Sequence, residues 1–269
     1  MMSAGPFRII VAALMLWTGC AFHLSMSNGA VSLHSSLRKT LVDALGLKVA
    51  ISGTHEGNLG WKGTTEWCDE VKGSKLTGVS SNVLTSAAGD ASCQLNAWMG
   101  PKFFVPHLLL TIGESNNGKY CVQADYVPRG PNAFGSDDSY VGNYFGNEVL
   151  AWYENAYSFD GSTALPPSKS FGARMLRSPV QVAVGGLSLS DATSVAETHV
   201  KRWLQWVSEG KESEARQRGA LNGRDDKLRQ FAFRAAFAEA TEKFGADLAR
   251  DVAAGMTGPV AEAYVGGGG

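Results

Sequence analysis

Short motifs that hold metals or nucleotides are missing from this sequence. Its four cysteines form no Cys-x-x-Cys pair and its five histidines form no His-x-x-x-His, so neither an iron–sulfur nor a zinc site is predicted. There is also no Gly-x-Gly-x-x-Gly and no phosphate-binding loop, which leaves a bound nucleotide or flavin unsupported. A net charge of −1 lacks the basic excess that nucleic-acid binding requires. We therefore expect no bound metal or cofactor and no nucleic-acid partner.

Acidic residues are absent from the start of the chain, where Asp43 is the first. A short basic start, an apolar run over 9–17 and the small residues after it give residues 1–21 the order of a secretory signal peptide, too short to span a membrane in the mature protein. Residues 22–47 are rich in serine, histidine and basic side chains, the composition of a plastid transit peptide. The small residues before Phe22 resemble the cleavage signature of bipartite leaders in algae with secondary plastids. We expect a plastid (chloroplast) protein, and simple secretion is the alternative.

The remaining cysteines do not indicate an oxidising compartment. Cys68, Cys93 and Cys121 are an odd number at wide spacing, unlike a disulfide framework. The chain also has no Asn-x-Ser/Thr acceptor for N-glycosylation. Both observations favour the plastid over secretion.

The length and composition predict a single folded domain. With 269 residues, 44% of them hydrophobic, the chain can bury one sizeable core. We expect this domain over 48–265, followed by a glycine tail at 266–269. Its first part, 48–74, contains several glycines and is expected to be an irregular entry segment.

Alternating apolar residues predict about five antiparallel strands. They are expected over 75–83, 93–99, 108–112, 120–126 and 180–184. Apolar residues at helical spacing predict helices over 191–207 and 224–244, and 141–157 is ambiguous. Strands in series with helices at their flanks predict an α+β fold, an α/β/α sandwich with a central antiparallel sheet flanked by helices.

The strongest chemical candidate is an acid near the middle of the chain. Strand alternation places Gln123 and Asp125 on one face and Tyr126 on the other. A carboxyl in a sheet covered on both faces is desolvated, which raises its pKa and suits it to deliver a proton near neutral pH. The alternative is an aspartate that hydrogen-bonds to the turn after the strand or pairs with Arg129. His107, at the start of the preceding strand, is either a proton donor at the rim of a pocket or a surface residue.

A set of residues in a fixed order carries a family resemblance. It comprises Asp125, Pro128 and Arg129 at the strand exit, then Asp138-Ser139-Tyr140, Tyr144-Phe145, Arg177-Ser178-Pro179, Trp203 and Phe244-Gly245. Over about residues 75–255 the chain thereby resembles red chlorophyll catabolite reductase, a relative of the ferredoxin-dependent bilin reductases.

This resemblance implies an α/β/α sandwich that binds an open-chain tetrapyrrole between sheet and helices. It also implies that reduced ferredoxin supplies electrons one at a time, without a bound cofactor, while acidic side chains supply protons. The implied function is ferredoxin-dependent reduction of an open-chain chlorophyll catabolite in the plastid. The catalytic candidates are Asp125 and His107, and the substrate-binding candidates are Thr111, Gln123, Tyr126, Arg129 and Tyr140. We leave open whether the chain forms a homodimer.

Two acidic positions of that family are occupied differently here. The resemblance places one acid on the strand before the hairpin turn, where this chain has Thr111, and one on the C-terminal helix, where it has residues 234–236. Glu114 and Glu239 could take the place of these two acids only if the backbone register of this chain differed from the alignment with the family. The alternative function is therefore a non-catalytic linear-tetrapyrrole-binding or chaperone-like protein, and an unrelated secreted binding protein is a third hypothesis.

A basic segment offers a surface for an acidic electron donor. Residues 201–234 contain nine basic and five acidic side chains. This local excess suits docking of ferredoxin, and an ordinary solvated helix face is the alternative.

Overall fold

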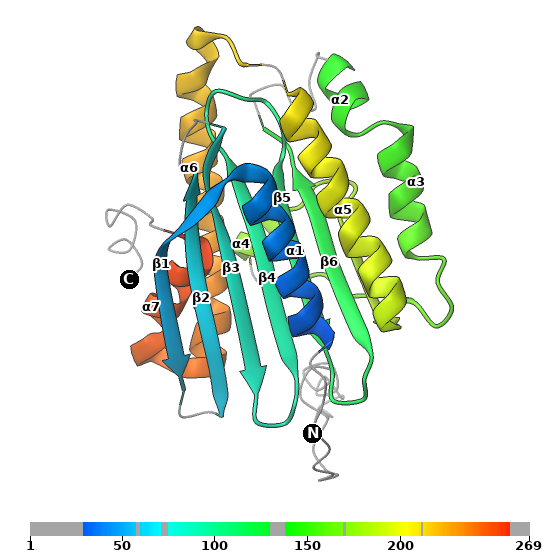
Figure 1. Ribbon diagram of the computed structural model, residues 1–269, viewed down its shortest axis with the longest axis vertical. Coiled ribbons are helices and arrows are strands. Elements are labelled where there is room, and N and C mark those ends of the chain that lie inside the picture. The colour runs from blue at the N-terminus through cyan, green and yellow to red at the C-terminus, as the bar shows by residue number, and fades with distance from the viewer. Residues whose placement is uncertain are drawn as a thin grey trace, which may run out of the picture.

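The computed structural model describes residues 29–57, 60–70, 75–129, 138–168, 171–210 and 212–258. The expected signal peptide at 1–21 and glycine tail at 266–269 lie outside these residues. Within them, one antiparallel sheet stands between two layers of helices (Figure 1). This arrangement confirms the predicted α+β fold.

The sheet has eight strands in the order β1-β2-β3-β4-β5-β6-β8-β7, each antiparallel to its neighbours. The strands are β1 (Leu47–Glu56), β2 (Trp61–Glu70), β3 (Leu76–Ser86), β4 (Ala91–Met99), β5 (His107–Glu114), β6 (Tyr120–Val127), β7 (Thr163–Ala164) and β8 (Val182–Leu187). The first six follow one another as a meander, which short connections allow between antiparallel strands. Each predicted strand has a counterpart, and β1, β2 and β7 are additional.

β1 and β2 occupy the region that the sequence predicted to be irregular, 48–74. Its glycines serve packing as well as turns. At Gly63 a Cβ atom would lie 2.7 Å from the Leu84 side chain and 3.2 Å from the Phe244 ring, so glycine lets β2 lie close to both. Such glycines interrupt the apolar alternation, so alternation alone does not predict β1 and β2.

Helices cover the sheet on both sides. The layer in front in Figure 1 consists of α1 (Gly29–Leu45), α2 (Asp138–Tyr144), α3 (Asn147–Ala156) and α5 (Leu189–Glu209). The layer behind consists of α4 (Phe171–Met175), α6 (Ala215–Phe244) and α7 (Ala246–Thr257). We call the two sides of the sheet the α5 face and the α6 face. None of the described helices combines the length and the apolar character needed to cross a bilayer.

α1 belongs to the folded domain, which corrects the expected domain start at residue 48. Leu37 and Leu41, four residues apart, are buried on one side of the helix and join the main core. The first turn is held by the Ala30 N–H, which donates to the Glu114 carboxylate at 2.9 Å.

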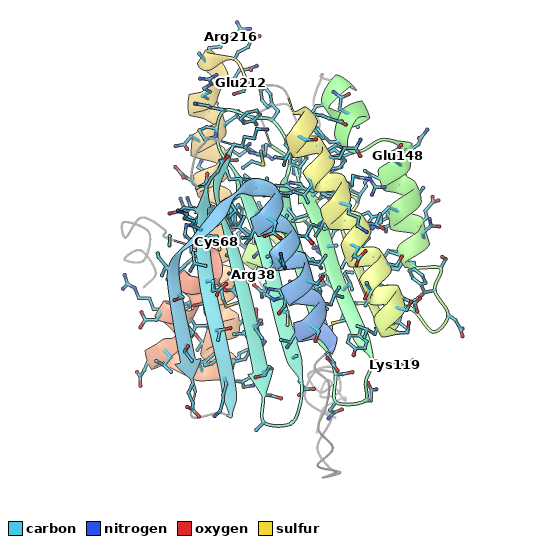
Figure 2. The ribbon with its side chains drawn as sticks, viewed as in Figure 1. Arg38, Cys68, Lys119, Glu148, Glu212 and Arg216 are labelled. Carbon is cyan, nitrogen blue, oxygen red and sulfur yellow. The ribbon has the colours of Figure 1, made fainter. Side chains whose placement is uncertain are left out.

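A salt bridge also joins α1 to the sheet. Arg38 donates to the Glu66 carboxylate at 2.6 Å, and the guanidinium also approaches the buried thiol of Cys68 (Figure 2). Because α1 contributes core residues, a transit peptide removed on import would have to end before Gly29 and not at residue 47.

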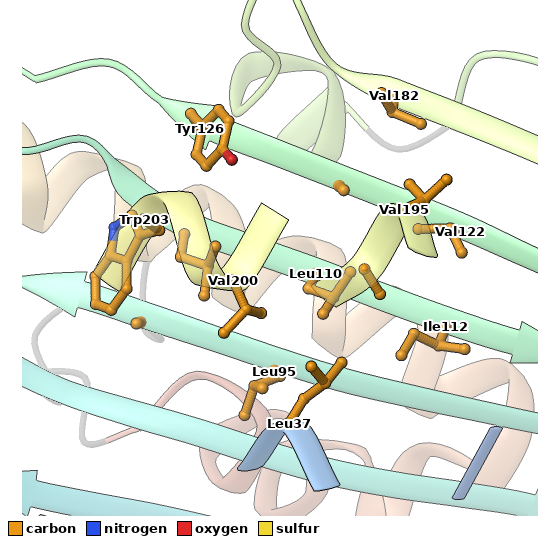
Figure 3. Close-up of a cluster of buried hydrophobic side chains, with 14 of the residues drawn as sticks. Leu37, Leu95, Leu110, Ile112, Val122, Tyr126, Val182, Val195, Val200 and Trp203 are labelled. Carbon is orange, nitrogen blue, oxygen red and sulfur yellow. The ribbon is translucent and has the colours of Figure 1, made fainter. Parts of the chain in front are cut away.

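The main core lies between the sheet and the helices of the α5 face. Figure 3 shows Leu110 and Val122 of the sheet clustered with Val200 and Trp203 of α5. Trp203 is fully buried, and its indole N–H donates to the Pro106 carbonyl at 2.8 Å. The apolar stripe predicted for 191–207 therefore faces the sheet.

α6 begins at Ala215, earlier than the predicted start at 224, and along its second half alanine recurs at every fourth residue of the buried side, at 232, 236 and 240. Ala236 and Ala240 are buried, whereas the larger Phe237 beside them is 39% exposed. Small side chains allow this 30-residue helix to lie close to its neighbours. They also weaken the hydrophobic signal from which its orientation could be predicted.

We expect Leu41→Ala to lower the free energy of unfolding by about 2–5 kcal/mol, because it leaves a cavity where a fully buried leucine joins α1 to the core. Ser36→Ala, on the exposed side of the same helix, is expected to change it by no more than about 0.5 kcal/mol. Urea denaturation of both variants measures the difference. Equal stability of the two would show that α1 is not part of the cooperative fold.

Candidate functional site

A row of polar side chains crosses the α6 face. Directly opposite one another in neighbouring strands, and therefore on one face, are Asn82, Gln94, Thr111 and Gln123. The Gln94 amide donates to the Glu239 carboxylate of α6 at 3.1 Å, which identifies the face. Asn82 is buried, Gln94 and Thr111 are half-buried and Gln123 is exposed, so this polar row becomes more accessible toward β6.

Asp125 lies two residues beyond Gln123 on the same face and is only 1% exposed. The Ser178 N–H donates to one carboxylate oxygen at 2.9 Å, and the Ser178 hydroxyl donates to the other. Burial raises the pKa of Asp125 to about 6, and these hydrogen bonds oppose the rise. Neither predicted alternative fits, because the donors to both oxygens belong to Ser178 and not to the turn after the strand, and Arg129 pairs with Asp225. Asp125 lies on the predicted face of the sheet, and its catalytic role stays a prediction.

A buried charged cluster fastens α6 to one end of this face. The Arg129 guanidinium donates to both carboxylate oxygens of Asp225, one of them at 3.1 Å, and to the carbonyl oxygens of Gly100 and Phe103. His107 joins from β5, with Nε2 at 3.0 Å from Asp225 Oδ1. Arg129 and His107 are fully buried. Arg129 is thus held inside the protein and is not a free side chain for binding substrate.

His107 does not lie at a pocket rim or on the surface, the two positions that the sequence suggested. Its Nδ1 accepts the Met99 N–H at 2.9 Å, so Nε2 carries the proton and donates to Asp225. Burial lowers the pKa of His107, although the nearby Asp225 carboxylate opposes this change. Both ring nitrogens of a neutral imidazole are therefore occupied, and His107 orients Asp225 from within the cluster.

Two predicted binding residues lie apart from the polar row. Tyr126 projects from the α5 face, where its hydroxyl donates to the His199 carbonyl at 3.0 Å and its ring packs on Trp152. Tyr140 on α2 is buried, and its hydroxyl accepts the Arg129 N–H at 2.9 Å. Both tyrosines pack within the protein. Of the predicted set, the structure brings Thr111, Gln123 and Asp125 together on the α6 face, and places His107, Arg129 and Tyr140 together in and beside the buried cluster.

Glu239 reaches the polar row, although the family resemblance offered it only as a replacement acid that required a different backbone register. Its carboxylate accepts hydrogen bonds from Gln94 at 3.1 Å and from Lys243 at 2.5 Å, and Gln94 lies directly opposite Thr111. Glu114 lies elsewhere, bound to the N-terminal turn of α1. The signal that could have identified Glu239 is its helical spacing from the buried alanines of α6.

A surface cavity of about 340 Å³ lies between α3 and α5, and its lining includes Trp152, Thr198 and Arg202. It is on the other side of the sheet from Asp125. Among the described residues, no three His, Cys, Asp or Glu side chains gather as metal ligands. The acid–base chemistry instead points to the α6 face, where an acid of raised pKa lies near amide and hydroxyl groups that can bind a polar ligand.

We expect Asp225→Asn to lower the free energy of unfolding by about 3–5 kcal/mol, because it leaves the buried Arg129 charge without its counter-charge. Asp226→Asn, at the neighbouring half-buried acid, is expected to cost less than about 1 kcal/mol. Guanidinium denaturation of the two variants tests this. If they prove equally stable, the cluster does not hold α6 in place.

Neither a family model nor a curated protein matches the sequence. Among solved structures, phytochromobilin synthase from tomato in complex with biliverdin is similar to this chain, with a TM-score of 0.63 at 14% sequence identity. The similarity covers 83% of this chain and 80% of that protein. The chain therefore shares the fold of phytochromobilin synthase.

Proposed function

We propose that this chain binds an open-chain tetrapyrrole at the α6 face and reduces it with electrons from ferredoxin. The observation that carries the proposal is Asp125, a buried acid of raised pKa on the same face as Thr111 and Gln123. The shared fold with a synthase solved in complex with biliverdin supports it. The sequence resemblance extends the proposal to an open-chain chlorophyll catabolite as natural substrate and to the plastid as location.

Reduction of one double bond in such a ligand takes up two electrons and two protons. Ferredoxin would supply the electrons one at a time, so the proposal needs no cofactor bound to this chain. Asp125 would give one proton to the reduced ring system and be reprotonated before the next turnover. The second proton would come from solvent, because the Glu239 carboxylate that reaches the polar row only accepts hydrogen bonds, from Gln94 and from Lys243.

The polar row offers groups that complement a linear tetrapyrrole. Pyrrole N–H groups are donors and terminal lactam carbonyls are acceptors. The amides of Gln94 and Gln123 can serve both, and the Thr111 hydroxyl can serve either. Leu109, half-buried and directly opposite Asp125, adds apolar surface for a ring. These groups would support binding whether or not reduction follows.

Docking of ferredoxin is proposed on the outer side of α6. Three basic side chains of the 201–234 segment are already paired with acids, in Lys201–Glu197, Arg216–Glu214 and Arg218–Glu212. Lys227 and Arg234 are exposed and two helical turns apart on α6. An acidic ferredoxin would be attracted to this side of the helix.

The competing proposal is a non-catalytic tetrapyrrole-binding or chaperone-like protein. Thr111 favours it, because the resemblance implies an acid at that position. The hydrogen bonds between Asp125 and Ser178 also suit a purely structural aspartate. The two proposals agree on binding and differ on turnover.

We expect biliverdin, or an open-chain chlorophyll catabolite, to give a saturable change in visible absorption when titrated with the protein. Reduced ferredoxin should then change the spectrum of the bound ligand. Asp125→Asn should bind within about tenfold of the wild type, about 1.4 kcal/mol, because most of the contact surface is unchanged. It should lose reduction, since an amide cannot deliver a carboxyl proton.

Asp160→Asn, which removes an exposed acid, is the matched control and should keep both binding and reduction. Binding without reduction by the wild type would favour the non-catalytic alternative. Reduction by Asp125→Asn at the wild-type rate would rule out Asp125 as the proton donor, and absence of any binding would overturn both proposals.

A second prediction concerns the acid that is replaced by threonine. Thr111→Glu is expected to raise the rate of reduction, because it adds a half-buried carboxyl to the polar row. The other family position cannot be restored in this way, because Ala236 is 5% exposed and clusters with Leu84, where a carboxylate would be buried without a partner. Thr111→Val is the control of similar size, and a Glu variant no faster than Val would contradict the prediction. Single-turnover absorption kinetics measure it.

A further inference from the structure

Ser178 makes two hydrogen bonds to the same carboxylate. It lies between α4 and β8, and its N–H and hydroxyl bind different oxygens of Asp125. The side chains of both residues are buried, Ser178 at 7% exposure. Contact at both oxygens fixes the plane of the carboxyl group as well as its position.

The direction of the hydroxyl proton follows from a third contact. Ser178 Oγ accepts the Val180 N–H at 3.2 Å, so one lone pair is occupied and the hydroxyl proton is free to point at Asp125. Ser178 is therefore a double donor to Asp125. Donors of this kind stabilise the ionised carboxylate, in opposition to burial, which favours the neutral acid.

Few other charges act on this carboxyl. Arg177, in the same segment, is the cation whose charge acts on Asp125, and the Tyr126 N–H adds a backbone hydrogen bond to the carboxylate. The side chain of Tyr126 lies on the α5 face with His199. Arg129 is engaged with Asp225. Ser178 is thus the side chain best placed to counter the desolvation of Asp125.

We propose that Ser178 is a positioning residue that holds the Asp125 carboxyl in a fixed orientation and, through the two hydrogen bonds it donates, stabilises the ionised form that remains once a proton is given up. The contribution of Ser178 to catalysis rests on the proposed reductase function, but the effect of Ser178 on Asp125 does not. Without Ser178, burial acts unopposed by the hydroxyl, and the acid holds its proton more tightly. Proton transfer to a ligand then becomes less favourable.

The test begins without any ligand. Infrared difference spectroscopy, with Asp125→Asn to identify the signal, follows the carboxyl band of Asp125 as pH is varied. Ser178→Ala should raise the proton affinity of Asp125 by about tenfold, because one hydrogen bond to a charged group is lost. Ser178→Cys, with a weaker donor of similar size, should raise it less, and Ser178→Thr should restore the wild-type titration.

Ser188→Ala is the matched control, since it removes a similar hydroxyl contact at the start of α5 and should leave the titration unchanged. An unchanged Asp125 titration in both Ser178→Ala and Ser178→Cys would overturn the proposal. In the ferredoxin-coupled assay, the pH profile of reduction should shift upward with the titration. A wild type that reduces nothing would defeat the reductase proposal alone, because the ligand-free titration still decides the role of Ser178.

Discussion

The buried contact between Arg129 and Asp225 determines how the longest helix meets the sheet. It joins residues 96 positions apart, and His107 on β5 binds the same carboxylate. Either partner alone would be an unpaired charge in the interior, so sliding or rotating α6 would cost several kcal/mol, on the order of the 3–5 kcal/mol for breaking such pairs. This constraint, more than the weak apolar stripe of the helix, fixes the register of α6.

The register of α6 in turn determines which of its side chains cover each part of the α6 face of the sheet. Leu228 clusters with Trp98, and Ala240 clusters with Leu84 farther along the helix. Between them Glu239 reaches the polar row. The strands toward β6 keep half-buried and exposed polar side chains, next to one buried acid. The same fixed helix therefore both completes the hydrophobic core and leaves a polar surface for chemistry.

Local pattern predicted those features that depend on neighbours in sequence. Alternation along β6 was enough to place Asp125 and Tyr126 on opposite faces, and the burial of Asp125 followed from a sheet covered on both sides. Features that depend on distant partners were not predictable. Nothing in the sequence around Asp225 predicts its contact with His107 on β5. Gly63 is typical of a turn unless Leu84 and Phe244 are known to lie beside it. Most of α1 falls in a segment that was predicted to be a leader because the chain has no acid before Asp43, whereas the leucine spacing of the helix reflects its place in the core.

We propose that the α6 face, and not the α5 face, receives the ligand. A crystal structure of the protein with biliverdin measures this directly. We expect a tetrapyrrole between the sheet and α6, within hydrogen-bonding distance of Thr111 or Gln123 and with a ring beside Asp125. Ligand density in the cavity between α3 and α5, beside Trp152, would contradict it.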